Sequence, residues 1–129
     1  MEQAIEVFAA IQLMIVGLSH IIQAGAWVDF FIWLRERGNT GVFLHGLMSL
    51  WFGSLILAFH HSWFGLTSVL TAVGYLYLLK ASLCFLLPSS QIRSLRRVSH
   101  ERAWEIKLAG VVFVAVAGIL SYAIWIGSS

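Results

Sequence analysis

The sequence predicts an all-α membrane protein, a four-transmembrane-helix bundle, and three observations carry that prediction. Hydrophobic residues make up 60% of the 129 residues and charged residues only 11%, whereas a soluble domain carries about 25% charged residues to cover its surface. Four apolar segments each approach the roughly 20 residues that a helix needs to cross the hydrocarbon layer. The basic residues gather between these segments or near their ends. The chain is therefore expected to form a single transmembrane domain.

The four spans are expected at about residues 5–22, 41–59, 64–87 and 104–126. They are expected to be helices because lipid offers no partner for free backbone groups, and they are too continuously apolar for barrel strands. Asn39 and Thr40 can cap the second span after Gly38 ends the preceding segment. Pro88 is expected to stop the third span just after Leu87.

A short helix is expected between the first two spans, at about residues 26–37. Its apolar residues recur at helical spacing on one face: Trp27, Phe30, Phe31 and Leu34. This pattern is typical of an amphipathic helix lying in the membrane interface. The alternative is one long tilted first helix that reaches Leu34. The Ala24-Gly25 pair favours a break and therefore the separate helix.

The two halves of the chain, residues 3–61 and 64–126, have the same layout of span, partly amphipathic segment and returning span. Two such hairpins would be related by a pseudo-twofold axis along the membrane normal. Residue identity between the halves is poor, so the likeness is also what any two hairpins would share.

All Lys and Arg residues lie in the first and third loops or at the helix ends beside them: Arg35, Arg37, Lys80, Arg93, Arg96, Arg97, Arg102 and Lys107. The positive-inside rule then places both loops in the cytoplasm and both termini outside. The outer side carries Glu2, Glu6, His60 and His61. We interpret His60 and His61 as polar anchors in the interface, with a peripheral metal contact as the alternative.

The basic loop after the third span suits the anionic inner leaflet, where each basic residue contributes about 1 kcal/mol. Its predicted membrane-surface contacts are Arg93, Arg96, Arg97 and Arg102. A protein partner is the competing interpretation. Nucleic acid is excluded as a partner because the chain has no soluble domain to bind it.

Small residues recur on single faces of the later spans: Gly46, Ser49 and Gly53; Thr67, Thr71, Gly74 and Ala81; Gly110, Ala117 and Ser121. Such stripes let helices approach closely in lipid, where packing replaces the hydrophobic driving force. They predict a compact bundle, a homo-oligomer or contact with a membrane-protein partner.

His20, His45 and His100 are predicted near the cytoplasmic ends of three spans. If they converge, they form a candidate haem or quinone site, since neutral imidazole is a common ligand. Asp29, Glu101 or Glu105 could orient the rings. The alternative is that each histidine bonds to a backbone carbonyl, a serine or a lipid headgroup. Cys84 is the single cysteine, which excludes a cysteine-based zinc site within one chain.

Lys80 lies inside the third span, where a charge costs roughly 2.5–3.5 kcal/mol. One hypothesis pairs it with Glu105, with Asp29 or with an anionic ligand. The alternative is that its long side chain reaches back to the cytoplasmic interface.

No catalytic motif was found, such as a Walker loop, G-x-S-x-G, H-E-x-x-H or C-x-x-C. The leading hypothesis is a non-catalytic subunit or scaffold of a larger membrane complex. The second is a haem- or quinone-binding redox protein that uses His20, His45 and His100. The third is a small oligomeric transporter in which Lys80 faces a polar cavity.

Three segments look like family signatures: GLSH at 17–20, AWVDFF at 26–31 and VSHERAWE at 98–105. The layout as a whole resembles small four-span bacterial inner-membrane proteins such as the DoxX-like proteins. The resemblance covers the whole chain as architecture only. It implies a bacterial inner membrane and assigns no functional residues.

Overall fold

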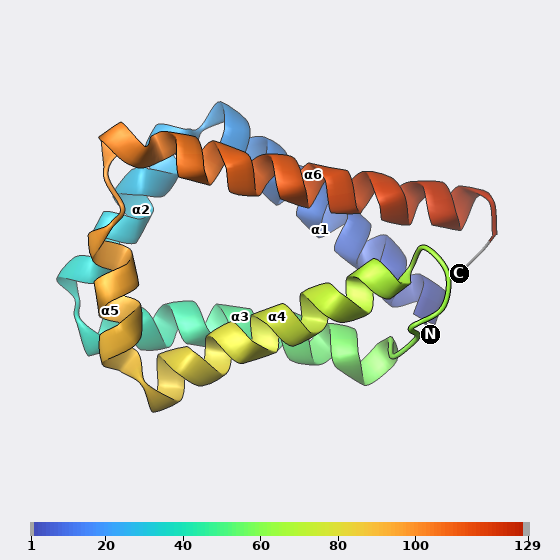
Figure 1. Cartoon of the computed structure of the whole chain (residues 1–129), viewed down its shortest axis with the longest axis horizontal. Helices are drawn as coiled ribbons and strands as arrows, with labels where there is room; N and C mark the ends of the chain where they lie inside the picture. The colour runs from blue at the N-terminus through green and yellow to red at the C-terminus, as the bar shows by residue number, and fades with distance from the viewer. Residues whose placement is uncertain (1, 128–129) are drawn as a thin grey trace.

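The computed structural model describes residues 2–127, and its regular structure is entirely helical over that range (Figure 1). The helices are α1 Glu2–Ile22, α2 Ala24–Glu36, α3 Asn39–Phe59, α4 Ser68–Leu86, α5 Pro88–Arg96, the 3-10 helix η1 His100–Arg102, and α6 Ala103–Trp125. Four are long and apolar enough to cross a membrane: Gln3–Ile22, Asn39–Phe59, Ser68–Leu86 and the continuous η1–α6 segment His100–Trp125. The prediction of an all-α membrane protein with four transmembrane helices is confirmed.

The short helix expected after the first span is present as α2. The chain turns at Gln23, between α1 and α2, and does not continue as one long helix. A second short helix, α5, was not predicted. Pro88 ends α4, as expected, but it also occupies the first turn of α5. The N–H groups of a first turn make no hydrogen bond within the helix, so proline, which lacks an N–H, is tolerated there.

The third span begins later than the predicted residue 64, because residues 60–67 form the connection from α3 to α4. Gly65 in this connection has a φ of +73°. Only glycine adopts that backbone conformation without steric cost. Ser62 bonds to the backbone of Phe64 within the connection, and Ser68 Oγ at the start of α4 donates to the Gly65 carbonyl at 2.9 Å.

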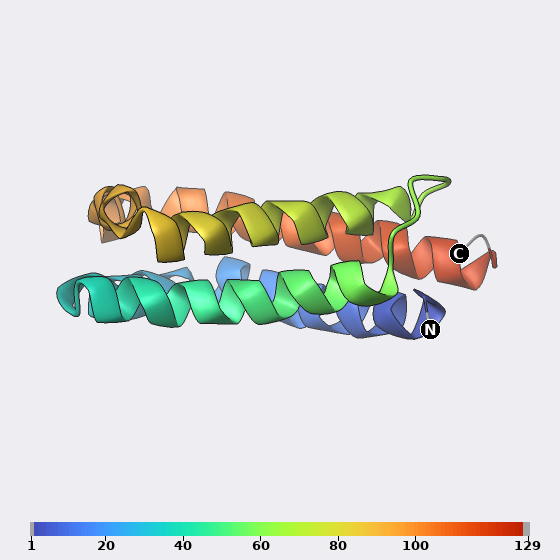
Figure 2. The ribbon, with the colours of Figure 1, turned by 90° about the horizontal axis from the view of Figure 1, so that it is seen from below.

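The helices form two layers, one from each half of the chain (Figure 2). Helices α1, α2 and α3 make one layer, and α4, α5 and α6 make the other. The layers stack so that α6 lies along α1 and α4 lies along α3, while α1 and α3 spread apart within their own layer (Figure 1). The close partners in the membrane are therefore α1 with α6 and α3 with α4.

This pairing has the pattern of a pseudo-twofold arrangement. Exchanging the halves turns the α1–α6 contact into the α4–α3 contact, and the α2–α6 contact into the α5–α3 contact. Helices α1 and α4 also run in the same direction along the long axis (Figure 1). The repeat predicted from the layout of the sequence is thus visible in the packing.

The α1–α6 pair is held at backbone contact by two glycines. A Cβ atom on Gly110 would lie 2.6 Å from the carbonyl oxygen of Gly17, and one on Gly17 would lie 2.9 Å from the carbonyl oxygen of Gly110. Both distances are shorter than real side chains tolerate. In α3–α4, a Cβ on Gly53 would meet the Gly74 carbonyl oxygen at 3.1 Å. The small residues therefore set the spacing of both pairs, as expected in lipid.

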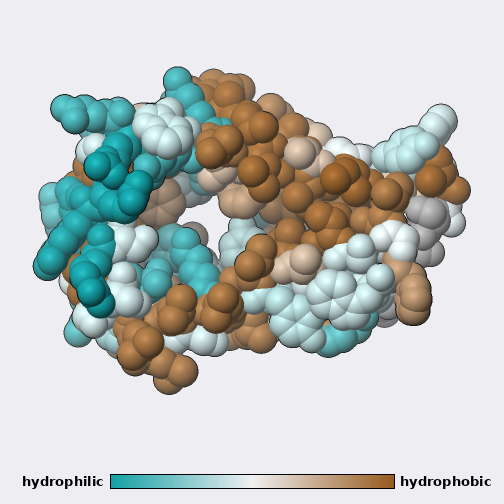
Figure 3. All heavy atoms as spheres, in the orientation of Figure 1, coloured by the Kyte–Doolittle hydropathy of each residue, from teal (hydrophilic) through white to brown (hydrophobic). Residues whose placement is uncertain are grey.

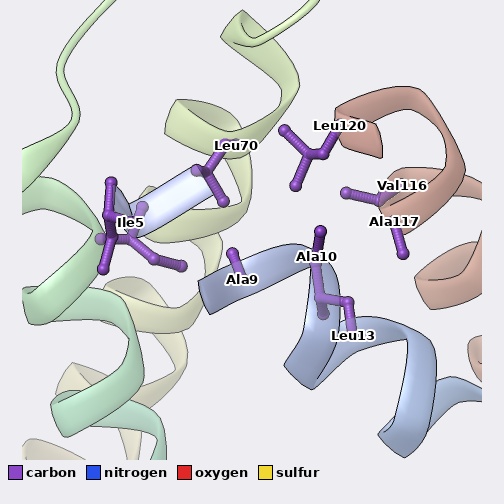
Figure 4. Packing of buried hydrophobic residues seen from close by; sticks show 9 residues of the cluster. Ile5, Ala9, Ala10, Leu13, Leu70, Val116, Ala117 and Leu120 are labelled. Carbon is purple, nitrogen blue, oxygen red and sulfur yellow. The ribbon is translucent and has the colours of Figure 1, made fainter. Parts of the chain in front are cut away.

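An apolar cluster packs all four spans together at the end of the bundle that holds the termini (Figure 4). Its buried members are Ile5, Ala9, Ala10, Leu13, Ile56, Leu70, Val116, Ala117 and Leu120. We refer to these nine residues as the apolar plug. The plug fills the space between the two helix pairs at this end.

The opposite end is closed by α2 and α5. Leu34 of α2 packs against Leu95 of α5 in a second buried cluster. The Arg35 Nη1 group donates to the carbonyl oxygens of Leu95 at 3.3 Å and of Val98 at 3.1 Å. Hydrophilic side chains gather at this end, whereas the flanks of the bundle are largely hydrophobic (Figure 3). The distribution fits a bundle with lipid around its middle and water at the end formed by α2 and α5.

Candidate functional site

A cavity of about 350 Å³ lies between the α1–α6 pair and the α3–α4 pair, beside α2. The space-filling view looks across the spans and shows the molecule hollowed between the two pairs (Figure 3). An opening on this flank faces the surrounding lipid when the four spans cross a bilayer. We refer to this space as the main cavity.

The wall of the main cavity is mostly aromatic and aliphatic. Its aromatic side chains are Trp27, Phe30, Phe31, Phe52, Tyr77 and Phe113. Its polar side chains are Gln12, His20, His45, Ser49, Lys80 and Glu105. They come from all four spans, so the site exists only when both helix pairs are in place.

His20 is held in one orientation on the α1 side of the cavity. Its Nδ1 donates to the Val16 carbonyl oxygen at 2.7 Å, because a carbonyl can only accept. The ring stacks on Trp27 with centroids 4.1 Å apart and meets the edge of Phe113 at 5.3 Å. With the proton on Nδ1, the Nε2 atom of the neutral ring is an acceptor or a ligand atom.

His45 lies on the α3 side of the same cavity, where its ring stacks on Phe31 at 5.6 Å. Its Nδ1 is buried and has no hydrogen-bond partner among residues 2–127. A buried polar atom without a partner costs about 1–3 kcal/mol, and this atom is covered by protein rather than open to the cavity.

The third predicted histidine does not reach the main cavity. His100 Nε2 lies 2.9 Å from Asp29 Oδ1 in an exposed contact between η1 and α2. The structure thus brings His20 and His45 to one cavity and leaves His100 outside it. In the part of the chain that is described, no group of three or more His, Cys, Asp or Glu side chains is placed to hold a metal ion.

Lys80 lines the main cavity and is not paired with either predicted carboxylate. The Glu105 carboxylate accepts from Arg97 at 2.8 Å, and Asp29 contacts His100. Within residues 3–127 no carboxylate lies within ion-pair distance of Lys80. The side chain is nevertheless accessible, and the surface that it presents includes the cavity wall.

A smaller cavity of about 160 Å³ lies between the main cavity and α5. The two cavities share four lining residues, Phe31, His45, Lys80 and Ile106. Gln91 and Ser94 of α5 add polar groups to the smaller one. His45 and Lys80 therefore stand where an apolar space meets a more polar one.

The predicted membrane-surface contacts Arg93, Arg96, Arg97 and Arg102 are all exposed, and they lie together at the end formed by α2 and α5. Lipid headgroups and a protein partner would both reach this surface.

The sequence places Glu6, His60 and His61 at the other end of the bundle but does not predict that Glu6 and His60 are buried. His60, expected as an interfacial anchor, is only 1% exposed, and its Nδ1 donates to Thr71 Oγ1 at 2.9 Å. The Thr71 hydroxyl in turn donates to the Ser62 carbonyl oxygen at 2.7 Å. Glu6 is also fully buried. His61 fits the expectation better, since it is exposed and bonds to Leu57 O and the Tyr75 hydroxyl at 3.0 Å each.

No family model, curated protein or solved structure matches this chain. The main cavity has an apolar, aromatic wall with a few polar groups, which is the general composition of a small-molecule binding site.

Proposed function

We propose that this protein binds a lipid-soluble small molecule in the main cavity and acts as a non-catalytic accessory subunit of a membrane complex. The observation that carries the proposal is the aromatic-walled cavity of about 350 Å³ inside the helix bundle. Small-molecule sites begin at about 300 Å³. A molecule dissolved in the bilayer reaches this space from the flank, without crossing water.

The proposed location is a bacterial inner membrane, with the end formed by α2 and α5 in the cytoplasm and both termini outside. The positive-inside rule supports this orientation, because Arg35 and the exposed arginines of the third loop lie at that one end. Binding is favoured over transport, because the apolar plug packs the four spans together between the cavity and the opposite side.

Filling the main cavity tests the proposal. Ala109 lines the cavity from α6, whereas Ala115 of the same helix is exposed on its outer face. The Ala109→Phe variant should lose a co-purifying small molecule that the unaltered protein carries, and Ala115→Phe should retain it. The measurement is native mass spectrometry of protein extracted from its own membrane in a mild detergent.

A bound mass lost only in Ala109→Phe supports the proposal. An unaltered protein that shows only its sequence mass, or a bound mass that both variants keep, contradicts it. A partner subunit in the same spectrum would identify the complex to which the protein belongs.

A haem or a quinone is the second candidate, favoured by the geometry of His20. The Nδ1 contact with Val16 leaves Nε2 as the available ligand atom, which is the usual orientation of a metal-bound histidine. We expect a haem-loaded protein to show a visible absorption band that His20→Leu removes and His61→Leu keeps. A colourless protein with a bound mass of quinone size would instead identify the ligand as a quinone.

A further inference from the structure

We propose that the ligand of the main cavity is a single-chain amphiphile with a carboxylate head, and that this head binds Lys80. The inference rests on the proposed function, since it assigns the chemical class of the molecule in the same cavity. The starting observation is that Lys80, a cation inside the transmembrane helix α4, has no carboxylate partner among residues 3–127.

Lys80 lies six residues before Leu86, the last residue of α4 (86 − 80 = 6). At 1.5 Å per residue it is about 9 Å from that helix end. A positive charge at such a position is unfavourable unless it reaches water or an anion. The two carboxylates predicted as its partners are engaged by Arg97 and His100. An anionic ligand would supply the missing charge.

The two cavities divide the volume around Lys80 into a more polar part and a more apolar part. The smaller cavity places Gln91, Ser94 and His45 near the lysine, so a head that enters it meets several hydrogen-bonding groups. The main cavity continues on the other side of His45 and Lys80 with aromatic walls. A molecule that spans both cavities therefore has an anionic head and an apolar body.

Charge and size narrow the class of anion. One lysine balances one negative charge, which a carboxylate carries. The volumes of about 160 and 350 Å³ suit a head and part of one chain. The remainder of the chain extends through the flank into lipid. A charge-assisted hydrogen bond from the ammonium to the carboxylate fixes the head at the boundary between the cavities.

The test compares dibromostearic acid with its methyl ester, which has the same chain and no charge. Bromine quenches tryptophan fluorescence on contact, and Trp27 lines the main cavity. The full chain is placed in phosphatidylcholine nanodiscs at a pH well above the ordinary pKa of a carboxylic acid. Quenching that disappears in Trp27→Phe is assigned to the cavity, and the remainder to lipid-facing tryptophans.

We expect the acid to bind about tenfold or more tightly than the ester, the factor that a charge-assisted hydrogen bond supplies. Lys80→Met should bind the acid no more tightly than the ester. Lys107→Met, which removes an exposed lysine of α6, should keep the full preference. Sodium acetate should not displace the acid, since it has the head without the chain.

Equal binding of acid and ester by the unaltered protein would overturn the carboxylate assignment and leave the proposed function standing. A preference that survives in Lys80→Met would overturn the role of the lysine. Displacement by acetate would show that the site takes a small water-soluble carboxylate without an apolar chain, and this result would also overturn the proposal. Quenching at Trp27 by neither probe would contradict both the carboxylate assignment and lipid-soluble binding. The comparison of acid with ester in the unaltered protein decides the ligand class even if Lys80→Met does not fold.

Discussion

Replacing Gly110 with isoleucine should separate α1 from α6 and destabilise the bundle by about 3 kcal/mol or more, the upper part of the range for overpacked cores. The first added carbon would lie 2.6 Å from the Gly17 carbonyl oxygen and 2.8 Å from the His20 Cβ. Both neighbours belong to the rigid part of α1, so neither can move without displacing the helix. The free energy of unfolding in a mild detergent measures the effect.

Gly118 provides the matched control on the same helix. A Cβ on Gly118 meets nothing within 4 Å, so Gly118→Ile should leave the free energy of unfolding nearly unchanged. If both variants are equally stable, the close α1–α6 contact does not hold the protein together. If both are equally unstable, the cost comes from the isoleucine in α6 and not from the contact.

Replacing Thr71 with valine should cost about 2–6 kcal/mol, because it removes two hydrogen bonds from a buried position at about 1–3 kcal/mol each. Thr71 is fully buried, accepts from His60 and donates to the Ser62 carbonyl. Valine has nearly the same shape, so the loss reports on the hydroxyl rather than on packing. Hydrogen exchange of residues 60–67 should also become faster.

Thr40 is the control for this substitution, because it is exposed at the start of α3 and the capping hydrogen bond expected of it is wrong: Gly38 is the N-cap, with no side-chain bond. Thr40→Val should change the free energy of unfolding by less than about 0.5 kcal/mol, as most surface substitutions do. A Thr71→Val protein with unchanged stability and unchanged exchange in the α3–α4 connection would show that the His60 contact carries no energy.

The spans and α2 were predictable because their signals are local. A run of apolar residues reports a transmembrane helix wherever it packs, and the Ala24-Gly25 pair marked the break before α2 within a few residues. Helix α5 could not be predicted from Pro88, because the residue type indicates the end of one helix as readily as the start of another. A proline in the first turn ends one helix and begins the next with the same side chain.

The sequence does not predict which spans pack against each other. Small residues indicate that a helix packs closely, but they do not identify the helix that it contacts. Gly110 was identified as part of a stripe, but its partner Gly17 was not. The burial of His60 was missed for the same reason, since its acceptor Thr71 lies across a loop. Of the three candidate histidines, His20 and His45 share a cavity, whereas His100 contacts the exposed Asp29 of α2 outside it.

The pairing of α1 with α6 also sets an order of assembly. Helices α3 and α4 are joined by a short connection, so they can pack as soon as both have entered the membrane. Helix α1 enters first and meets its partner only when the last span has been synthesised, across nearly the whole chain. The main cavity, which is lined by all four spans, is therefore completed in the final step. The site proposed for a lipid-soluble ligand therefore exists only once α6 is in place, and entry from the flank follows assembly.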